Sequence, residues 1–562
     1  MPSSAPEQES TRTKPPTRAR HRWFPLLVLV AASVWWLQQA AYAGYYTLFH
    51  FITVVLSASA IGLWYLLCGG ASRRVRRSIV GGLTLLCLIF FALFRPIYNG
   101  DMGVFGWRLR YAHDVDERLQ QIESHEQAAD WQTTPRDYPR FLGHGYWAEV
   151  DGVELETDWQ MHPPEEMWRR EIGAGWSAFA IVGNYAVTQE QRGDRELVSC
   201  YRLDTGAPVW VHADEARFDP ADVAGSLGDV GPRATPTIVG ERVFTQGGTG
   251  IVNCLDARTG KVQWSHDTAE ELDVPVTVWG KSGSPLIVDD TVVIGVGAPA
   301  NGEAQLAGEA ASAAVNSLHK QNYESSLVAF DVETGDIRWT AGKRRTSYAT
   351  PIVVDLASER QIVVVNESWV TGHRASDGTV LWEHPWANKH DNNASAAQPM
   401  PVGGDRLLLT KGYGTGASLL AIERGDDGEF SAEPLWDPPI KRVMKTKFSN
   451  VVIRDGFVYG LDDVLLACME LDTGNVKWKK RRSPEFGHGQ IMLIGDVILV
   501  LSETGELALV AASPDEYREL ASMQALDDAN VTWNNPAFAS PYLLVRNARE
   551  AVSYRLPLKT ND

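Results

Sequence analysis

The chain reads Leu471-Asp472-Thr473-Gly474-Asn475-Val476-Lys477-Trp478, and the same phrase returns in four other places. In each copy an apolar strand runs into a turn, and a tryptophan stands four residues after the glycine of that turn. The glycine supplies the positive φ that a short hairpin loop needs. Trp436 marks a degenerate sixth copy. The other four pairs are Gly206 and Trp210, Gly260 and Trp264, Gly335 and Trp339, and Gly378 and Trp382.

Another pair of strands precedes each phrase, so each unit has four antiparallel strands, which is the make-up of one propeller blade. The eighth unit stops after its third strand at 551–556, and the early segment 166–172 has the pattern of an outer strand. We therefore expect an all-β, eight-bladed β-propeller of four-stranded blades, closed by that segment so that no sheet edge is exposed. The units begin near Trp176, Arg233, Trp279, Tyr348, Gln398, Phe448, His488 and Trp533.

The repeated phrase resembles the tryptophan-docking motif of pyrroloquinoline-quinone-like propellers, over about residues 139–558. The resemblance implies that the tryptophans pack between neighbouring blades. It leaves the function open, because this fold serves quinoprotein dehydrogenases, which oxidise alcohols or sugars, and also the outer-membrane assembly lipoprotein of the β-barrel machinery, which binds no quinone. The residues that match the motif are Trp210, Trp264, Trp339, Trp382 and Trp478, with Gly206, Gly260, Gly335, Gly378 and Gly474.

A membrane anchor is predicted ahead of the propeller. Residues 24–70 are nearly free of charge and long enough for two spans of about 20 residues each, with a turn at Gly44. Four arginines in 73–77 precede a third apolar run, 78–94. A cleaved signal peptide is the alternative, and the two later apolar runs argue against it. The predicted divisions are a basic tail (1–23), about three transmembrane helices (24–97), a linker (98–138) and the propeller (139–562).

The charge distribution predicts the orientation in the membrane. Residues 1–97 carry a net charge of +8 and the remainder of the chain −26. The basic tail and the 73–77 loop should stay in the cytoplasm, which places the chain after about residue 98 outside. We therefore expect an inner-membrane protein with a cytoplasmic N-terminus and a propeller in the periplasm or outside. Nucleic acid is not expected as a partner, because an acidic domain repels phosphate backbones.

The loops that lead into the innermost strands face the central channel of a propeller, and here they carry aromatic, cationic and amide side chains. Such a funnel suits a polar planar or anionic ligand, through stacking and charge-assisted hydrogen bonds. The alternative is an inert channel filled with water. The candidate ligand-binding residues are Trp176, Arg233, Trp279, Lys281, Tyr348, Lys447, His488, Gln490, Trp533 and Asn534.

No catalytic or metal-binding residue is assigned from the sequence. His488, between two glycines, is the most exposed candidate for catalysis, but no second His or Cys lies at metal-ligand spacing from it. Residues 299–322 form an insertion rich in Ala, Gly and Glu. This insertion serves either as a lid or partner surface or as a loose excursion of the chain.

Three functions are compatible with these features. The first is a binding or assembly scaffold that holds an envelope protein or a small ligand. The second is an oxidoreductase that uses pyrroloquinoline quinone and calcium. The resemblance implies that such an enzyme needs a Ca²⁺ site of Glu, Asn and Asp with an Asp base, and many members carry two adjacent cysteines, which this sequence lacks. The third is an extracytoplasmic sensor, for which no signalling domain is found in the sequence.

Three cysteines test the repeat. Cys200, Cys254 and Cys468 each stand six residues before the glycine of their motif, and the same slot holds Ala329 and Gly372 elsewhere. A slot that takes small residues predicts a tight core position with three buried, unpaired thiols. A disulfide between blades is not expected, because equivalent positions in packed sheets lie about 10 Å apart and a disulfide needs Cα atoms within about 7 Å.

Overall fold

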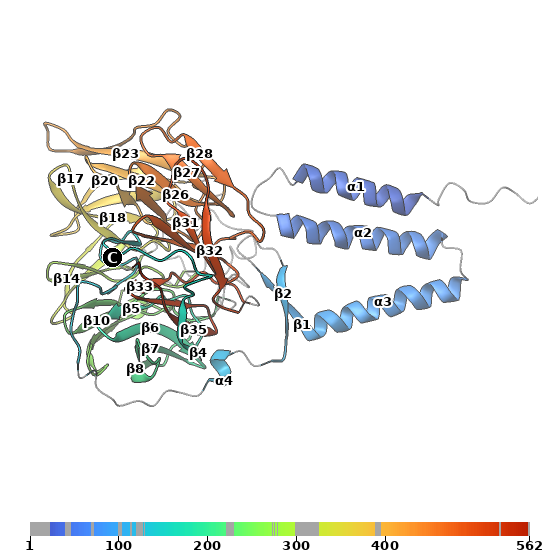
Figure 1. The fold of residues 1–562 in the computed structure, drawn as a ribbon, viewed down its shortest axis with the longest axis horizontal. Helices are drawn as coiled ribbons and strands as arrows, with labels where there is room; N and C mark the ends of the chain where they lie inside the picture. Colours follow the sequence, from blue (N-terminus) through green and yellow to red (C-terminus); the bar gives the residue numbers. More distant parts are fainter. Residues whose placement is uncertain are drawn as a thin grey trace, which may run out of the picture. The chain divides into compact units, whose positions relative to one another are not determined.

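The structure is a computed structural model of the chain. It divides into two compact units, Met1–Ala112 and His113–Asp562; helices make up most of the first and sheets most of the second (Figure 1). The predicted turn at Gly44 and the insertion 299–322 lie outside the described residues. The structure describes residues 23–39, 46–68, 72–98, 104–112, 115–119, 128, 130–220, 230–272, 274, 276–277, 279–297, 325–387, 395–527 and 530–559.

The first unit contains three helices and a hairpin. Arg76 joins two of the helices, because its Nη1 donates to the carbonyl of Leu66 at 2.6 Å. That carbonyl lies in the last turn of its helix, where backbone oxygens lack partners within the helix. The elements are α1 (Phe24–Gln39), α2 (Tyr46–Cys68), α3 (Arg73–Leu93), β1 (Phe94–Tyr98) and β2 (Val104–Leu109).

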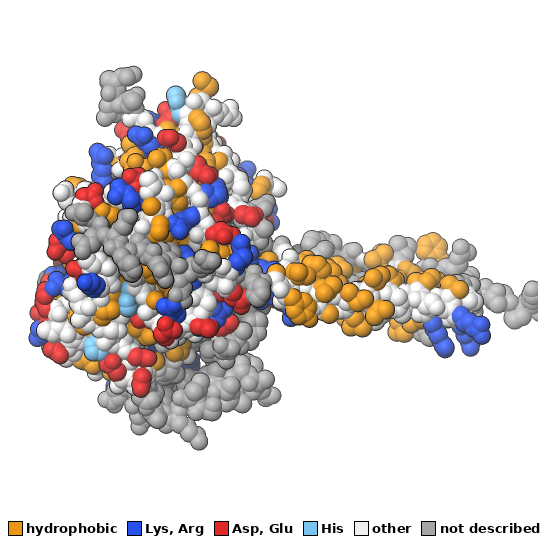
Figure 2. Space-filling model, turned by 90° about the horizontal axis from the view of Figure 1, so that it is seen from below, with side chains coloured by type: hydrophobic (Ala, Val, Ile, Leu, Met, Phe, Trp, Pro, Cys, Tyr) orange, Lys and Arg blue, Asp and Glu red, His pale blue; other side chains and the backbone are white. Residues whose placement is uncertain are grey.

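The helix α3 carries the apolar surface expected of a membrane helix. Its side chains Leu83, Leu86 and Leu88 are each more than half exposed, and hydrophobic side chains cover much of the helical unit (Figure 2). Among the described residues α3 is the one helix long and apolar enough to cross a bilayer, and a shorter apolar stretch, Leu56–Leu66, lies within α2. The prediction of three spans and of their orientation stays a prediction.

The second unit is the expected eight-bladed propeller, and each blade contains four antiparallel strands, to which a short parallel strand is added in blade seven. Blades one and two are β5 (Ala180–Val182), β6 (Tyr185–Arg192), β7 (Arg195–Arg202) and β8 (Pro208–Asp214), then β9 (Thr237–Val239), β10 (Arg242–Gln246), β11 (Ile251–Asp256) and β12 (Val262–Asp267). Blades three and four are β13 (Leu286–Val288), β14 (Thr291–Gly295), β15 (Leu327–Asp331) and β16 (Ile337–Ala341), then β17 (Ile352–Leu356), β18 (Glu359–Val365), β19 (Trp369–Arg374) and β20 (Val380–Pro385).

The remaining blades follow the same order from the channel outwards. Blades five and six are β21 (Met400–Pro401), β22 (Arg406–Lys411), β23 (Gly416–Arg424) and β24 (Phe430–Pro434), then β25 (Val451–Arg454), β26 (Phe457–Asp462), β27 (Leu465–Glu470) and β28 (Val476–Lys480). Blades seven and eight are β29 (Gln490–Ile494), β30 (Val497–Leu501), β31 (Glu506–Ala511) and β32 (Glu519–Gln524), then β33 (Ala537–Ala539), β34 (Tyr542–Arg546), β35 (Glu550–Arg555) and β4 (Glu165–Glu171).

The ring closes as the sequence predicts. The strand β4, from the start of the propeller unit, pairs antiparallel with β35 and puts Trp168 opposite Ser553. Blade eight therefore combines three strands from the C-terminal end with one from the N-terminal side. This exchange pairs the outer edge of β35, which would otherwise present unpaired backbone groups.

At five of the junctions between blades, a tryptophan covers the motif glycine of the next blade. The indole of Trp264 lies against Gly335 and its Nε1 donates to the carbonyl of Val332 at 3.1 Å. Trp436, the degenerate copy, likewise lies against Gly474. Glycine is required at this position for two reasons. Its φ is positive, and a Cβ would meet the neighbouring indole. The same arrangement joins Trp168 to Gly206, Trp210 to Gly260 and Trp339 to Gly378.

Substituting one of these glycines separates the two effects. Gly335 has φ +79° and its Cβ would lie 2.9 Å from the Trp264 ring, whereas Gly240 has φ +59° and open space around it. Both Gly335→Ala and Gly240→Ala should lose about 1–2 kcal/mol to the left-handed backbone. We expect Gly335→Ala to lose about 1–3 kcal/mol more, because the indole must move. Chemical denaturation measures the difference, and equal losses would contradict the docking role.

The cysteine slot lies directly opposite the docking tryptophan of its own blade. Cys200 stands opposite Trp210, Cys254 opposite Trp264 and Cys468 opposite Trp478 in the register of the third and fourth strands. All three thiols are buried and form no disulfide, which confirms the prediction. Burial raises the pKa of Cys254 and of Cys468 to about 12. The slot is small because a Cβ on Gly372, in the same register, would collide with the Trp382 indole.

Part of the segment assigned to the linker packs against the propeller instead. Trp131 stacks on Tyr185 of blade one with ring centroids 5.5 Å apart, and its Nε1 donates to the carbonyl of Gly240 at 3.0 Å. The short helix α4 (Val115–Arg118) precedes it, and Asp116 pairs with Arg217 at 3.0 Å. The propeller unit thus extends back to His113, ahead of the predicted start at 139.

Residues 138–150, the crossing segment, run along the free edges of the innermost strands. Tyr138 exchanges backbone hydrogen bonds with Ile181 of blade one, and β3 (Glu149–Val150) pairs parallel with β29 of blade seven. Between these points Tyr146 is buried among core residues of blades three and four. These contacts lie where the first strand of each blade turns into the second, so the crossing segment spans that end of the channel.

Candidate functional site

All ten candidate residues lie at or just before the first strand of a blade. They therefore gather at the end of the channel where the first strands begin, opposite the end that the crossing segment spans. Burial differs among them: Trp176, Trp279, Tyr348 and Trp533 are partly exposed, and the remaining six are buried. The buried six are Arg233, Lys281, Lys447, His488, Gln490 and Asn534.

Ring contacts join the aromatic members around Trp533. The Trp533 ring lies 4.8 Å from Trp176 and 4.8 Å from Phe448, measured between centroids. Phe448 in turn meets the His488 ring at 5.8 Å, edge to face. Three neighbouring blades are thus connected through side chains at the channel mouth, and blade one continues the series.

Arg233 extends this series of ring contacts from Trp176 to Tyr348 and Trp279. Its guanidinium lies 4.8 Å from the Trp176 ring and 4.4 Å from the Phe218 ring, which is cation–π geometry. It also hydrogen-bonds Tyr348, whose ring lies 5.9 Å from Trp279. We call this continuous set the belt; its members are Trp279, Tyr348, Arg233, Trp176, Trp533, Phe448 and His488.

Two amide side chains behind the belt keep their acceptor oxygens available. Gln490 Nε2 donates to the carbonyls of Phe448 and Trp533 at 3.0 and 2.8 Å, and Asn534 Nδ2 donates to two main-chain carbonyls at 3.1 and 3.0 Å. The carbonyls determine which amide atom is nitrogen. The oxygens of both amides, and Nε1 of Trp279, are buried without a partner among the described residues, a condition that a water or a ligand normally relieves.

Two lysines complete the polar content of the channel mouth. The Nζ of Lys281 donates to the carbonyl of Val296, and burial lowers the pKa of Lys281 to about 7. The Nζ of Lys447 lies 5.0 Å from the ring of Tyr413. Arg233 and Lys447 give the channel mouth cationic groups inside an otherwise acidic domain, which favours an anionic or polar ligand, whereas Lys281 is only partly charged at neutral pH.

A buried glutamate that the sequence did not single out lies beside the belt. The two carboxylate oxygens of Glu196 share the backbone N–H of Gly248, at 3.1 and 3.0 Å from its nitrogen. Burial raises the pKa of Glu196 to about 8, against the opposing effects of the Gly248 hydrogen bond and the Arg233 charge. Perturbed acids of this kind concentrate at functional sites, although structural networks produce them too.

The Glu196 shift predicts a pH dependence of stability. Between the ordinary pKa of 4.5 and the folded value of about 8, the folded carboxyl holds a proton that the unfolded one has lost. The free energy of unfolding should therefore fall as pH rises through this window, by at most about 1.4 kcal/mol per pKa unit.

Glu196→Gln keeps an acceptor for Gly248 and removes the titration. We expect the variant to match the wild type near pH 4.5 and to exceed it at pH 8.5, as measured by urea unfolding. Identical pH profiles for the two proteins would mean that Glu196 is ionised in the folded state.

His488 is not the exposed group that its flanking glycines suggested. Its side chain is 2% exposed, and its backbone N–H donates to Glu503 at 3.3 Å. The glycines have structural reasons: Gly487 has φ +61°, and a Cβ on Gly489 would collide with the carbonyl of Leu501. We therefore place His488 in the wall of the belt and assign it no catalytic role.

Sequence reasoning missed the second layer of the site. Phe218, Tyr413 and Glu503 all contact belt or lysine side chains, yet none of them begins an innermost strand. Glu503 lies in the turn between β30 and β31, at the same end of the blade as the loops that were examined. Tyr413 likewise lies between β22 and β23, whereas Phe218 lies between β8 and β9; these turns and connections reach the same face as the loops that were examined.

Comparison with known proteins identifies the family of this fold. A family model described as outer membrane protein assembly factor BamB matches residues 156–306 and 296–480, which together span more than half of the chain. The chain belongs to the PQQ-like β-propeller family. No curated protein matches it significantly.

Solved structures agree with this PQQ-like propeller in fold. The quinohemoprotein alcohol dehydrogenase ADHIIG from Pseudomonas putida HK5 has 13% identity and a TM-score of 0.51, over 76% of this chain and 81% of the other. BamB from Moraxella catarrhalis has 13% identity and a TM-score of 0.45, over 71% and 99%. At such identities the likeness concerns the fold alone.

Proposed function

We propose that this PQQ-like propeller is a binding or assembly scaffold of the cell envelope, tethered to the membrane by its N-terminal helices. The observation that carries the proposal is the belt, a continuous series of aromatic and cationic side chains at one end of the channel. A purely structural channel has no need for such a series, because apolar packing and the docking tryptophans already hold neighbouring blades together.

The chemistry of the belt suits an occupant with a flat, polar or anionic group. Partly exposed indoles such as Trp176 and Trp533 offer stacking faces, while Arg233 and Lys447 supply positive charge nearby. The acceptor oxygens of Gln490 and Asn534 would take N–H or O–H donors from the occupant. The name of the matching family model, an outer membrane assembly factor, supports an envelope protein as partner; a small ligand is the alternative.

The quinone alternative requires a different set of donors. Among the described residues no group of three His, Cys, Asp or Glu is placed to hold a metal ion. Two carboxylates near the belt accept hydrogen bonds from N–H groups: Glu196 from the backbone of Gly248, and Glu503 from the indole of Trp533 at 2.8 Å. These contacts favour the scaffold over the quinone and calcium enzyme as our proposal. A quinone absorption band after addition of pyrroloquinoline quinone and Ca²⁺, with alcohol oxidation, would favour the enzyme.

Cross-linking from the belt tests the scaffold. A photoreactive phenylalanine analogue at position 176 should cross-link an envelope protein in living cells, or retain a small ligand seen by native mass spectrometry. The same analogue at Val380, exposed on the outer strand β20, is the control. An occupant that appears equally at both positions, or at neither, contradicts binding at the belt.

The tether has its own test. The arginines of 73–77 and the basic tail lead us to propose a cytoplasmic N-terminus. Reporter fusions after residues 45, 75 and 110 should read external, internal and external. An internal reporter after residue 110 would overturn the three-span arrangement and place the propeller in the cytoplasm.

A further inference from the structure

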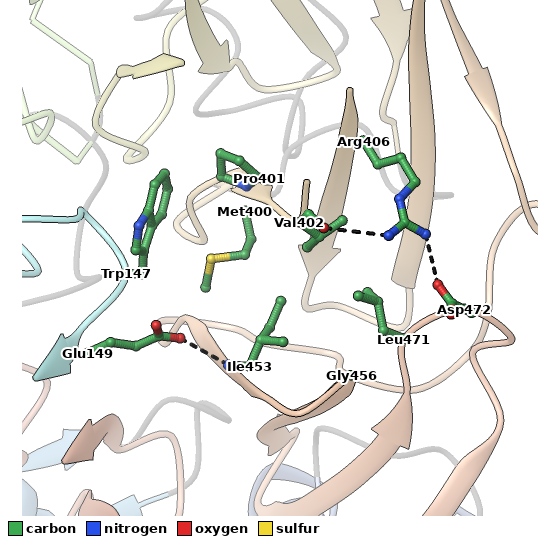
Figure 3. Close-up of a pocket in the computed structure, with 10 residues that line it drawn as sticks. All are labelled: Trp147, Glu149, Met400, Pro401, Val402, Arg406, Ile453, Gly456, Leu471 and Asp472. Atoms are coloured by element: carbon green, nitrogen blue, oxygen red, sulfur yellow. Dashed lines mark hydrogen bonds and ion pairs between the residues drawn. The ribbon is translucent and has the colours of Figure 1, made fainter. Parts of the chain in front are cut away.

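A cavity of about 430 Å³ opens at the end of the propeller opposite the belt, between blades five and six (Figure 3). Its size falls within the range of about 300–1,000 Å³ that is typical of small-molecule sites. The cavity is separate from the channel mouth, and two of its lining residues, Leu471 and Asp472, begin the docking phrase of blade six. The residues that line it are Trp147, Glu149, Met400, Pro401, Val402, Arg406, Ile453, Gly456, Leu471 and Asp472.

The wall of this cavity comes from three parts of the chain. Trp147 and Glu149 belong to the crossing segment, and the remaining residues come from blades five and six. The crossing segment is held in place there by β3, which pairs with β29, and by the packing of Trp147 against the core residues of blades five and six. The side chains that line the cavity are therefore positioned by tertiary contacts on several sides.

The two ends of the cavity differ in charge. At one end Arg406 and Asp472 pair at 2.8 Å and balance each other. At the other end Glu149 accepts a hydrogen bond from the backbone N–H of Ile453 at 3.2 Å. Arg454, the cation close enough to influence Glu149, forms ion pairs with Asp496 and Asp455 instead.

The middle of the cavity is apolar. Figure 3 shows Met400, Val402, Ile453 and Leu471 between the two polar ends, with the Trp147 ring beside the carboxylate of Glu149. A carboxylate next to an indole is a combination that binds organic cations, because the indole face attracts positive charge and the carboxylate accepts N–H donors. An anion would be repelled both by Glu149 and by the acidic domain around it.

We propose that this cavity binds a small organic cation, an ammonium group on an apolar or aromatic body. The ammonium group lies between Trp147 and Glu149, and the body packs against the apolar side chains of blades five and six. Because Trp147 and Glu149 belong to the crossing segment, an occupied cavity ties that segment to both blades. Binding should therefore raise the melting temperature of the propeller.

Three probes with the same phenyl body test the charge preference. They are 2-phenylethylammonium, 3-phenylpropionamide and 3-phenylpropionate, titrated into the full chain in a nonionic detergent by calorimetry. We expect the ammonium probe to bind at least tenfold more tightly than the amide, and the carboxylate probe to show no binding. Equal affinity for all three would mean that only the apolar body is recognised, and the proposal would fail.

Variants locate the binding. Glu149→Gln keeps an oxygen for the Ile453 N–H and should weaken the ammonium probe at least tenfold, whereas Glu154→Gln, exposed and outside the cavity, should change nothing. Val402→Phe fills the cavity from blade five and leaves Glu149 in place; it should abolish both binding and the rise in melting temperature. Unchanged binding in Val402→Phe overturns the proposal even if Glu149→Gln fails to fold. Trp176→Ala should bind normally, which separates this site from the belt.

Discussion

A chain that begins at Gly173 should lose the cooperative unfolding of the propeller, and a chain that begins at His113 should keep it. The shorter chain lacks β4, so blade eight is left with three strands and β35 with an unpaired edge. It also lacks Trp168, whose indole covers Gly206 and donates to the carbonyl of Leu203 at 2.9 Å. The crossing segment, which borders the innermost strands, is missing as well.

Thermal unfolding followed by circular dichroism, with light scattering, measures the outcome. We expect the chain from Gly173 to aggregate or to melt without a sharp transition. The chain from His113 is the matched control, since it keeps every strand of the propeller and removes only the helical unit. Similar sharp transitions for both chains would show that the ring does not depend on its N-terminal strand.

Arg546→Met should be the most damaging single substitution at the seam where blade eight meets blade one. The guanidinium of Arg546 is fully buried and donates to Thr188 Oγ1 at 2.9 Å and to the carbonyls of Gln189 and Gly173 at 3.0 and 2.8 Å. Burial lowers the pKa of Arg546 to about 10, and the charge of Glu190 opposes that shift.

Methionine fills similar space but leaves these acceptors and part of the Glu190 charge without a partner. Glu190 keeps its ion pair with Arg192, at 3.0 Å. The substitution therefore weakens the interactions at the seam but leaves one ion pair in place. Breaking a buried ion network by removing one member costs about 3–5 kcal/mol. Arg555→Met, on the exposed side of β35, should cost less than about 0.5 kcal/mol. Urea unfolding compares the two, and a loss below 1 kcal/mol for Arg546→Met would contradict a structural role for the seam.

The repeat made the architecture predictable from sequence. The spacing between motif glycine and tryptophan repeats because, at five junctions, an indole of one blade packs on the motif glycine of the next, as Trp264 does on Gly335. The small slot at Cys200 followed from the same register, and its partner proved to be the tryptophan of its own blade. Ring closure by 166–172 was also readable, since a blade with three strands needs a fourth.

The candidate site was predictable only in part. Residues that precede the innermost strands all gather at one face, because successive antiparallel strands return the chain to that face in every blade. Trp176, Arg233 and Trp533 were found in this way. The sequence did not reveal their burial and their contacts, because Phe218, which contacts Arg233, and Glu196, beside the belt, come from a loop and a strand that the repeat does not mark.

What the sequence by itself determined is the repeated part of the molecule: the strands, their order, the tight turns and the closing strand, all of which depend on local spacing. The tertiary structure decided where non-repeated residues lie. The crossing segment has no periodic pattern, and only the assembled ring provides the strand edges that it follows and the cavity wall that Trp147 and Glu149 complete. The buried charges of Arg546 and Glu190 likewise depend on two blades from opposite ends of the chain, and such a contact between distant segments leaves no local signal.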